Sequence, residues 1–279
     1  MSESARRVPL APPSPLAGEG WGGGYAARTD SVDLPSSRPP SAVDLPRKGG
    51  GDRAKGAAAI TIASITFHAD PMGALYWPER GVLAIADLHL EKGSSFAARG
   101  QLLPPYDSAA TLARLARLIA YYAPRCVVAL GDNFHDGGGP ARLGAEDRES
   151  LHALQRGRDW IWLAGNHDPE PAADIGGVFQ ETLNLGALTF RHQPTGATGE
   201  IAGHLHPFAR IAHRGRAVSR RCFAADATRL VMPALGVFTG GLNIRDAAFA
   251  DVFGTLKFTA HMLGEDRLYT FAAKRCLPA

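Results

Sequence analysis

From residue 60 onward, short apolar runs alternate with amphipathic stretches. Residues 60–67 alternate in polarity and are rich in β-branched side chains, so they predict one strand. Residues 82–86, 126–130 and 160–164 are short, almost wholly apolar runs, which is typical of strands buried on both faces. These four segments therefore predict the strands of a sheet with a covered interior.

Two amphipathic stretches separate the buried runs. The first can be capped by Asp107 or Ser108 and is ended by Pro124, and its apolar positions have helical spacing: Leu112, Leu115, Ile119 and Tyr122. The second carries acidic residues in its first turn, where the helix dipole favours them: Glu146, Asp147 and Glu149. Strands alternating with helices predict parallel βαβ units.

After about residue 178 the pattern changes to short strands with Gly-rich turns. We expect a second, mostly antiparallel sheet packed on the first. Residues 57–279 are thus expected to form one α/β domain.

The segment 1–56 differs in composition, with 8 Pro, 9 Gly and 7 Ser and no histidine or cysteine. It contains too little apolar surface to offset the entropy of ordering, so we expect a disordered extension. This extension is a tether, a short-motif ligand or an incidental addition to the chain. Prolines interrupt its apolar stretch, so we expect no export signal and a cytoplasmic protein. The chain has no apolar run long enough for a membrane-spanning helix.

Charge and cysteine content bear on the possible ligands of the protein and on its compartment. The chain has a net charge of +3, and residues 57–279 carry only +1 of it, so charge alone does not predict nucleic-acid binding. Three cysteines cannot all pair, which favours a reducing compartment. All ten histidines lie after residue 56, and six belong to polar clusters that follow the apolar runs.

These clusters contain the candidate chemistry. The first two are Asp87-Leu88-His89 and Gly131-Asp132-Asn133-Phe134-His135-Asp136, and the third is Gly165-Asn166-His167-Asp168. His192 and Gly203-His204-Leu205-His206 follow later. Ligands bind outside the carboxyl ends of strands in open α/β sheets, so we expect the five clusters to converge.

The residue types in the clusters favour metal binding. Residues i and i+2 of a strand share a face, so Asp87 with His89, and His204 with His206, can each point at one ion. Carboxylate, amide and imidazole ligands without cysteine suit Mn, Fe or Zn in a reactive site. Each short motif is weak alone, but the ordered set is specific.

The set resembles the calcineurin-like metallophosphoesterase superfamily over about residues 60–265. This resemblance implies a four-layer α/β/β/α sandwich with two metal ions. One ion would be held by Asp87, His89 and His206, the other by Asn166, His192 and His204, and Asp132 would bridge both. His167 matches the histidine that positions the phosphate and protonates the leaving oxygen. His135 replaces a more frequent aspartate, and it either supports a neighbour or contacts substrate.

The implied reaction is phosphoester hydrolysis by a hydroxide that bridges the two metal ions, with Asp132 and His167 as catalytic residues. Metal binding needs ionised acids and neutral imidazoles, so we expect activity to fall in mild acid.

A narrower resemblance links the chain to the bacterial ligase-associated DNA-damage-response endonucleases. It rests on six segments: Asp87–Gly93 (DLHLEKG), Arg99-Gly100, Gly131–Asp136, Gly203–Pro207 (GHLHP), Arg220–Phe223 (RRCF) and residues 230–243 (LVMPALGVFTGGLN). The resemblance implies a Mn-dependent endonuclease acting on single-stranded DNA in repair, with a DNA ligase and a helicase as partners. Asn166, His135, Lys92 and Arg99 would contact the substrate.

Two alternatives remain at the level of sequence. The same chemistry can act on a small nucleotide or phosphomonoester. A metal-free binding scaffold is the other alternative, but all seven ligand positions hold competent residues, which argues against it.

Overall fold

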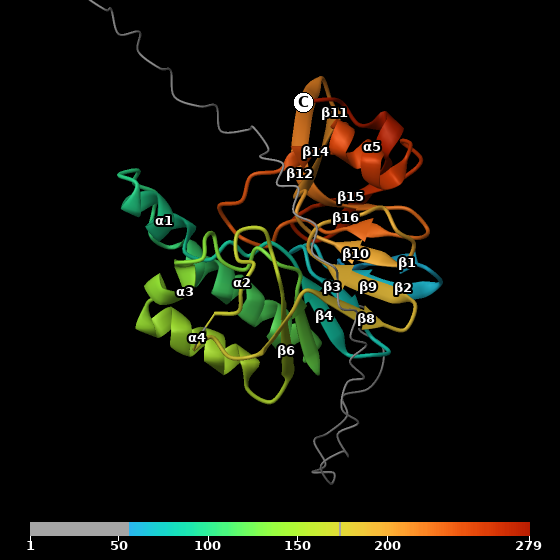
Figure 1. The fold of residues 1–279 in the computed structure, drawn as a ribbon. Helices are drawn as coiled ribbons and strands as arrows, with labels where there is room; N and C mark the ends of the chain where they lie inside the picture. The colour runs from blue at the N-terminus through green and yellow to red at the C-terminus, as the bar shows by residue number, and fades with distance from the viewer. Residues whose placement is uncertain (1–55, 173) are drawn as a thin grey trace, which may run out of the picture. The chain divides into compact units, whose positions relative to one another are not determined.

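The computed structural model describes residues 56–172 and 174–279 (Figure 1). The expected extension, residues 1–56, lies outside these ranges except for Gly56. Among the described residues, no helix is both long and apolar enough to cross a membrane.

The first sheet has seven strands in chain order: β1 (Ala58–Ile62), β2 (Ile65–Ala69), β3 (Leu75–Trp77), β4 (Val82–Ile85), β5 (Cys126–Ala129), β6 (Asp159–Leu163) and β7 (Val178–Gln180). Strands β4 to β7 are parallel, as the predicted βαβ units require. Their carboxyl ends therefore meet at one edge of the sheet.

The single strand predicted over residues 60–67 is wrong, because the structure has a hairpin there. Strands β1 and β2 pair antiparallel around Ala63 and Ser64, which both have positive φ (48° and 67°). Such a two-residue turn matches the twist of the flanking strands. Neither residue is a glycine or asparagine, so the sequence lacks the usual signal for this turn.

The second sheet has nine strands: β8 (Thr182–Leu185), β9 (Leu188–Arg191), β10 (Glu200–Ala202), β11 (Pro207–His213), β12 (Arg216–Ala225), β13 (Leu230–Val231), β14 (Leu242–Asn243), β15 (Thr259–Leu263) and β16 (Leu268–Ala272). Five of its pairs are antiparallel: β8–β9, β11–β12, β12–β13, β12–β15 and β15–β16. The pairs β9–β10, β10–β13 and β11–β14 are parallel. The expected antiparallel character is thus the majority, within a mixed sheet.

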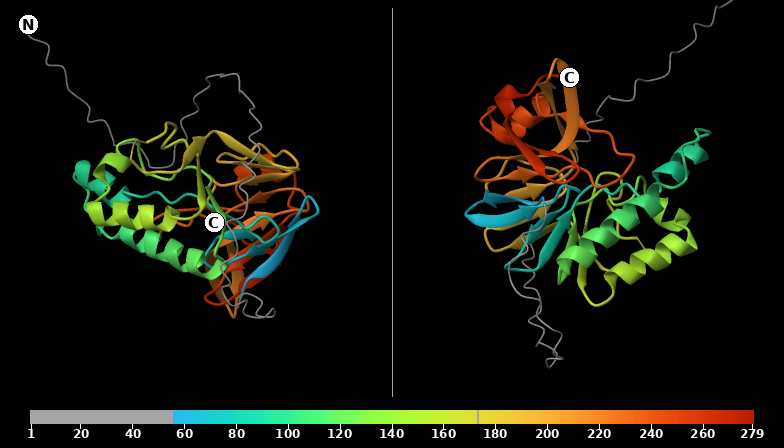
Figure 2. Two further views of the ribbon diagram at one scale, coloured as in Figure 1. Left: turned by 90° about the horizontal axis from the view of Figure 1, so that it is seen from below. Right: turned by 180° about the vertical axis from the view of Figure 1, so that it is seen from behind.

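Helices complete a four-layer α/β/β/α arrangement (Figures 1 and 2). The helices are α1 (Lys92–Ala98), α2 (Asp107–Tyr122), α3 (Gly139–Arg142), α4 (Ala145–Gln155) and α5 (Ala247–Phe253), with a 3-10 turn over Ala273–Arg275. Leu115 of α2 and Leu151 of α4 pack with Val127 on one face of the first sheet. Phe190 and Phe223 of the second sheet pack with Leu163 on its other face. Phe249 of α5 packs against the far side of the second sheet.

Helix α2 spans the predicted apolar positions, but neither predicted residue caps it. Its N-cap is Tyr106, without a side-chain hydrogen bond. The Asp107 carboxylate instead accepts from Gly93 N–H (3.0 Å), and the Ser108 hydroxyl accepts from Glu91 N–H (2.9 Å). These two side chains fix the chain that leads from the first cluster into α1, a tertiary use that competes with capping.

Candidate metal centre

Four acid and imidazole side chains form the first donor group. Asp87 and His89 follow β4, Asp132 follows β5 and His206 precedes β11, and their ligand atoms all lie within 4.8 Å of one another. His206 Nε2 lies 3.4 Å from Asp87 Oδ1 and 3.3 Å from His89 Nε2. His89 Nε2 lies 3.6 Å from Asp132 Oδ2. These side chains can bind one cation from several sides.

The second donor group shares Asp132 with the first. His192 Nε2 lies 3.3 Å from Asp132 Oδ1, and His204 belongs to the same cluster. The Asn166 side-chain oxygen lies 2.8 Å from His192 Nε2 and 2.9 Å from His204 Nδ1. Asp132 therefore presents one oxygen to each group, which is the arrangement that the sequence analysis expects of a bridging carboxylate.

The donor set of the second group fits a metal ion. His192 Nδ1 lies 2.9 Å from the carbonyl oxygen of Leu130, so it carries the proton and leaves Nε2 with a lone pair. His192 Nε2 also lies 3.1 Å from His204 Nδ1, and the amide oxygen of Asn166 offers only lone pairs. The lone pairs of His192 Nε2 and of the Asn166 oxygen repel unless a proton on His204 Nδ1 or a cation lies between them. A divalent cation satisfies all three together.

Left-handed backbone conformations place most of these ligands. Five of the seven expected ligands have positive φ: Asp87 (53°), His89 (43°), Asp132 (46°), His204 (70°) and His206 (43°). Such values are uncommon outside glycine and cost about 1–3 kcal/mol where the surroundings enforce them. The strand argument for these pairs is therefore wrong, because the residues lie beyond the strands in tight loops. His204 and His206 consequently belong to different donor groups.

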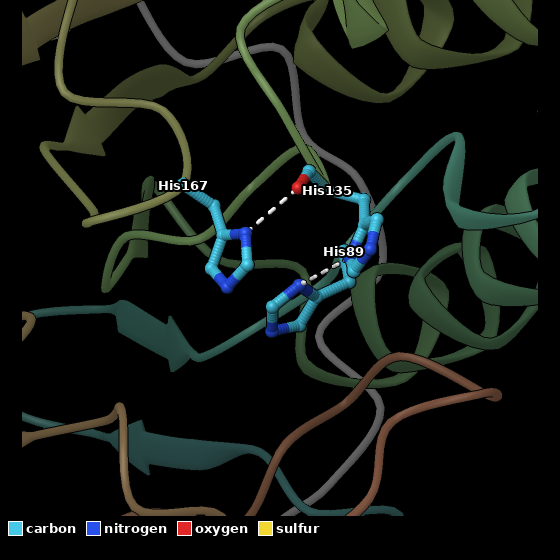
Figure 3. Close-up of side chains that lie close together, drawn as sticks. All are labelled: His89, His135 and His167. Carbon is cyan, nitrogen blue, oxygen red and sulfur yellow. Dashed lines mark hydrogen bonds between the residues drawn. The ribbon is translucent and has the colours of Figure 1, made fainter. Parts of the chain in front are cut away.

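A third cluster joins the first group to His167 (Figure 3). His89, His135 and His167 also have ligand atoms within 4.8 Å of one another. His167 Nδ1 lies 2.8 Å from the carbonyl oxygen of His135, so this nitrogen carries a proton and donates it. His167 Nε2 then lies toward the centre, 3.9 Å from Asp132 Oδ2. The His135 ring stacks on His167 and lies 3.4 Å from His89, nitrogen to nitrogen.

Burial and neighbouring charges shift the pKa values of the ligands. Burial lowers the pKa of His89 to about 2, against the attraction of Asp132. Burial opposes the charged form of His192, but the hydrogen bond and charge of Asp132 outweigh it and raise its pKa to about 9. Burial also opposes ionisation of Asp132, yet His192 holds its pKa below the usual range. In the metal-free protein, His192 and Asp132 thus form an imidazolium–carboxylate pair within the second donor group.

This pair predicts how metal affinity depends on pH. His192 must lose its proton before Nε2 can bind a cation, so protons compete with the metal below about pH 9, which includes the interval from pH 6.5 to 8.5. The affinity for Mn²⁺ should therefore rise with pH over this interval, by at most about tenfold per unit. His89 and His204 have lowered pKa values and add no slope there. Calorimetric titration at pH 6.5, 7.5 and 8.5 measures this trend, and a constant affinity would contradict it.

Gly165 lets the loop after β6 lie close to the loop after β5. A Cβ at this position would lie 2.0 Å from Asp132 N and 2.4 Å from Asp132 Oδ1. Gly165→Ala should displace the shared carboxylate, lower the free energy of unfolding by about 1–3 kcal/mol and reduce metal affinity. Gly144→Ala is the control, because a Cβ there meets open space. Urea unfolding and metal titration of both variants test the prediction, and equal behaviour would refute it.

Asp168 and Asn133 are supporting residues to which the sequence analysis gives no role. One carboxylate oxygen of Asp168 accepts from the backbone N–H groups of Asn133 (2.9 Å) and Phe134 (3.2 Å). The Asn133 side chain donates to the Leu163 carbonyl (3.1 Å). These bonds tie the loop after β6 to the loop after β5, which fixes Asn166 relative to Asp132. The sequence feature that could have identified them is their position inside the motifs Gly131–Asp136 and Gly165–Asp168.

Two of the expected substrate residues, Lys92 and Arg99, lie on the His135 side of the centre. Lys92 begins α1 and is half-buried, with its ammonium 5.7 Å from the Phe96 ring centroid. Arg99 is the exposed C-cap residue of the same helix. Burial, and then the charges of Lys92 and His167 with a smaller effect of Arg99, lower the pKa of His135 to about 4. The positive charges of Lys92 and Arg99 are therefore close enough to affect His135.

Other candidate side chains lie outside the centre. The cysteines Cys126, Cys222 and Cys276 are free and buried, and burial raises the pKa of Cys126 to about 12, which makes it a poor nucleophile. Phe134 is fully buried and packs in the core under α2, so it does not face a ligand.

Comparison with known proteins shows which family and which solved structures the chain resembles. Residues 81–216 match the model of the calcineurin-like phosphoesterase family. The chain is 27% identical to the Pseudomonas putida nuclease MPE, covering 77% of this chain and 100% of that one, with a TM-score of 0.60. It is 14% identical to Yfce, a phosphoesterase from E. coli, over 69% of this chain and 98% of that one, with a TM-score of 0.34. A search of curated protein sequences gives no match.

All seven expected ligands lie within the matched residues 81–216. Residues 81–216 form a calcineurin-like phosphoesterase domain, and the protein is a metal-dependent phosphoesterase. Members of this family bind two divalent metal ions, and the clusters around Asp132 are able to hold metal.

Proposed function

We propose that the protein is a bimetallic phosphodiesterase that cuts single-stranded DNA during repair. The observation that carries the proposal is the pair of donor groups that share Asp132, with His167 beside them. The similarity to the Pseudomonas putida nuclease supports a nucleic-acid substrate. Lys92 and Arg99 support it too, because they place positive charge near the centre.

Each residue has a defined part in this proposal. Two divalent ions, when bound, supply Lewis acidity and an oxygen nucleophile at neutral pH. Asp87, His89 and His206 would hold one ion, Asn166, His192 and His204 would hold the other, and Asp132 would contribute to both. The carbonyl of His135 orients His167, so that Nε2 can hold a proton for the departing ester oxygen. Lys92, Arg99 and His135 contact the phosphate groups, and Asn166 contacts both metal and substrate.

We assign manganese as the native metal, with iron or zinc as the alternatives. Oxygen and imidazole donors without thiolate suit all three. Dialysis against a chelator should abolish hydrolysis, and added Mn²⁺ should restore it more fully than Zn²⁺ or Mg²⁺. Metal analysis of the restored protein should give about two ions per chain. Full activity after complete metal removal would contradict the proposal.

The alternative substrate is a small nucleotide or phosphomonoester. The near-neutral body favours it, since residues 57–279 carry a net charge of only +1 and lack a general field for DNA. Rates on a single-stranded 20-mer, on bis-p-nitrophenyl phosphate and on p-nitrophenyl phosphate separate the two functions. Rapid turnover of a small ester with intact DNA would establish the alternative.

The repair setting is a separate part of the proposal. The resemblance to the ligase-associated endonucleases implies a cytoplasmic enzyme that works with a DNA ligase and a helicase. Tagged protein isolated after DNA damage should carry both partners. Their absence would limit the proposal to the hydrolytic reaction.

A further inference from the structure

Three arginines line one open groove of about 380 Å³ beside the metal centre. Arg114 comes from α2, and Arg220 and Arg221 come from β12. We call this surface, defined by these three residues, the arginine groove. Glu265 is the one acidic residue that lines it.

The charges of the arginine groove are not neutralised by carboxylates. Within residues 56–172 and 174–279, the arginines with a carboxylate within 4.0 Å are others: Arg142, Arg191, Arg229 and Arg267. Arg114 donates to the Leu235 carbonyl (2.9 Å). Burial and the charge of Arg114 lower the pKa of Arg221 to about 10. Because carbonyl oxygens are neutral, these hydrogen bonds do not cancel the positive charge of the arginine groove.

Arg221 organises the loop over residues 234–239, which contacts both the arginine groove and the first cluster. Its guanidinium donates to four carbonyls of that loop: Ala234 (3.0 Å), Gly236 (2.8 Å), Val237 (3.4 Å) and Thr239 (3.0 Å). On its other side, the loop bonds to the backbone of the first cluster, through Leu235 N–H to Ala86 (2.8 Å) and Gly236 N–H to Asp87 (3.2 Å). One short segment therefore contacts both Arg221 of the arginine groove and the backbone of the expected ligand Asp87.

The same loop presents an exposed aromatic ring. Phe238 is 38% exposed, and the two carbonyls that flank it, those of Val237 and Thr239, are both held by Arg221. An exposed ring on a fixed backbone loses little entropy when a flat partner stacks on it. Positive grooves combined with exposed aromatic side chains are typical of single-strand binding.

We propose that the arginine groove binds a backbone phosphate of a single-stranded nucleic acid whose scissile phosphate lies at the metal centre, and that Phe238 stacks on a base of this strand. This inference rests on the proposed function and deepens it by adding a subsite away from the reacting phosphate. Arginine presents several donors in a planar fork that suits phosphate oxygens.

The three arginines have different parts in this subsite. Arg220 is exposed, and its one hydrogen bond among the described residues goes to the carbonyl of the adjacent Ser219 (3.1 Å). It is therefore the arginine that contacts the phosphate. Arg221 is a positioning residue, because its donors are committed to the loop. Arg114 adds charge from the helix side.

The test compares Arg220→Ala with Arg216→Ala, a matched exposed arginine of the same strand that does not line the groove. Anisotropy of a fluorescent thymidine 20-mer, measured in EDTA to prevent cleavage, gives Kd as a function of salt. Arg220→Ala should raise Kd at least about fivefold and reduce the slope of log K against log salt by about 0.7, as loss of one single-strand phosphate contact predicts. Arg216→Ala should leave both values unchanged.

A second pair of variants tests the aromatic contact. Phe238→Ala should weaken binding of the 20-mer at least about fivefold, whereas Phe238→Tyr should keep wild-type binding, because tyrosine also stacks. Duplex DNA should show no such difference, since its bases are already stacked. In turnover with Mn²⁺, the KM for the 20-mer should rise in Arg220→Ala with little change in kcat.

The outcomes separate this inference from the proposed function. If Arg220→Ala binds and cleaves the 20-mer like Arg216→Ala, with an equal salt slope, the subsite is refuted and the proposed function stands. If Phe238→Ala and Phe238→Tyr bind equally well, the stacking contact is refuted. If wild-type protein neither binds nor cleaves the 20-mer but hydrolyses small esters, the proposed DNA substrate itself is refuted.

Discussion

Asp132→Asn is expected to reduce phosphodiester hydrolysis by about a thousandfold or more. Asp132 presents one oxygen to each donor group and lies 3.6 Å from His89 and 3.3 Å from His192. The substitution keeps the shape but removes the negative charge that holds two cations together. Loss of several kcal/mol of charge stabilisation corresponds to this change in rate. The metal content should fall from about two ions per chain to one or fewer.

The matched control for this variant is Asp159→Asn. Asp159 is exposed at the start of β6, at the opposite end of the sheet from the centre. Steady-state rates on bis-p-nitrophenyl phosphate and metal analysis should be unchanged in the control. A thermal unfolding scan of both variants with metal removed separates loss of metal from loss of fold. Wild-type rates in Asp132→Asn would refute the two-metal model.

His167→Ala is expected to slow cleavage of DNA by about a hundred- to ten-thousandfold, the usual contribution of a general acid. The His135 carbonyl fixes Nδ1 as the donor, so Nε2 is the atom that can deliver a proton. An alkoxide is a poor leaving group and depends on that proton, whereas p-nitrophenolate leaves readily without it. The loss on bis-p-nitrophenyl phosphate should therefore stay below about tenfold. Metal content should remain that of the wild type.

The control for His167→Ala is His213→Ala, an exposed histidine on β11. It should keep both activities. An equal loss on DNA and on the nitrophenyl ester would show that His167 positions the phosphate and does not protonate the leaving group. The two substitutions in the centre thus separate two parts of the proposed chemistry, because Asp132 governs metal content and His167 governs leaving-group dependence.

Much of the fold was predictable from local sequence. Residues 126–130 and 160–164 form β5 and β6 nearly as expected, because wholly apolar runs of this length can be satisfied only inside a covered sheet. The spacing of Leu112, Leu115 and Ile119 likewise determines α2. The hairpin at Ala63 and Ser64 was missed, because its turn lacks the usual residues. The first turn of α2 was misassigned, because Asp107 bonds a distant backbone group.

The sequence by itself predicted which residues would carry the chemistry. Each cluster directly follows a strand or precedes one, and the ends of parallel strands meet at one edge, so the convergence of Asp87, Asp132 and Asn166 is a consequence of local order. The local strand pattern did not predict how the donors divide, although the family resemblance implied the division. Left-handed backbone at His204 and His206 directs the two side chains into different groups, although a strand would have paired them. Tertiary structure alone brought Arg114 beside Arg221, since only the packing of α2 against the loop after β13 joins residues so far apart in the chain.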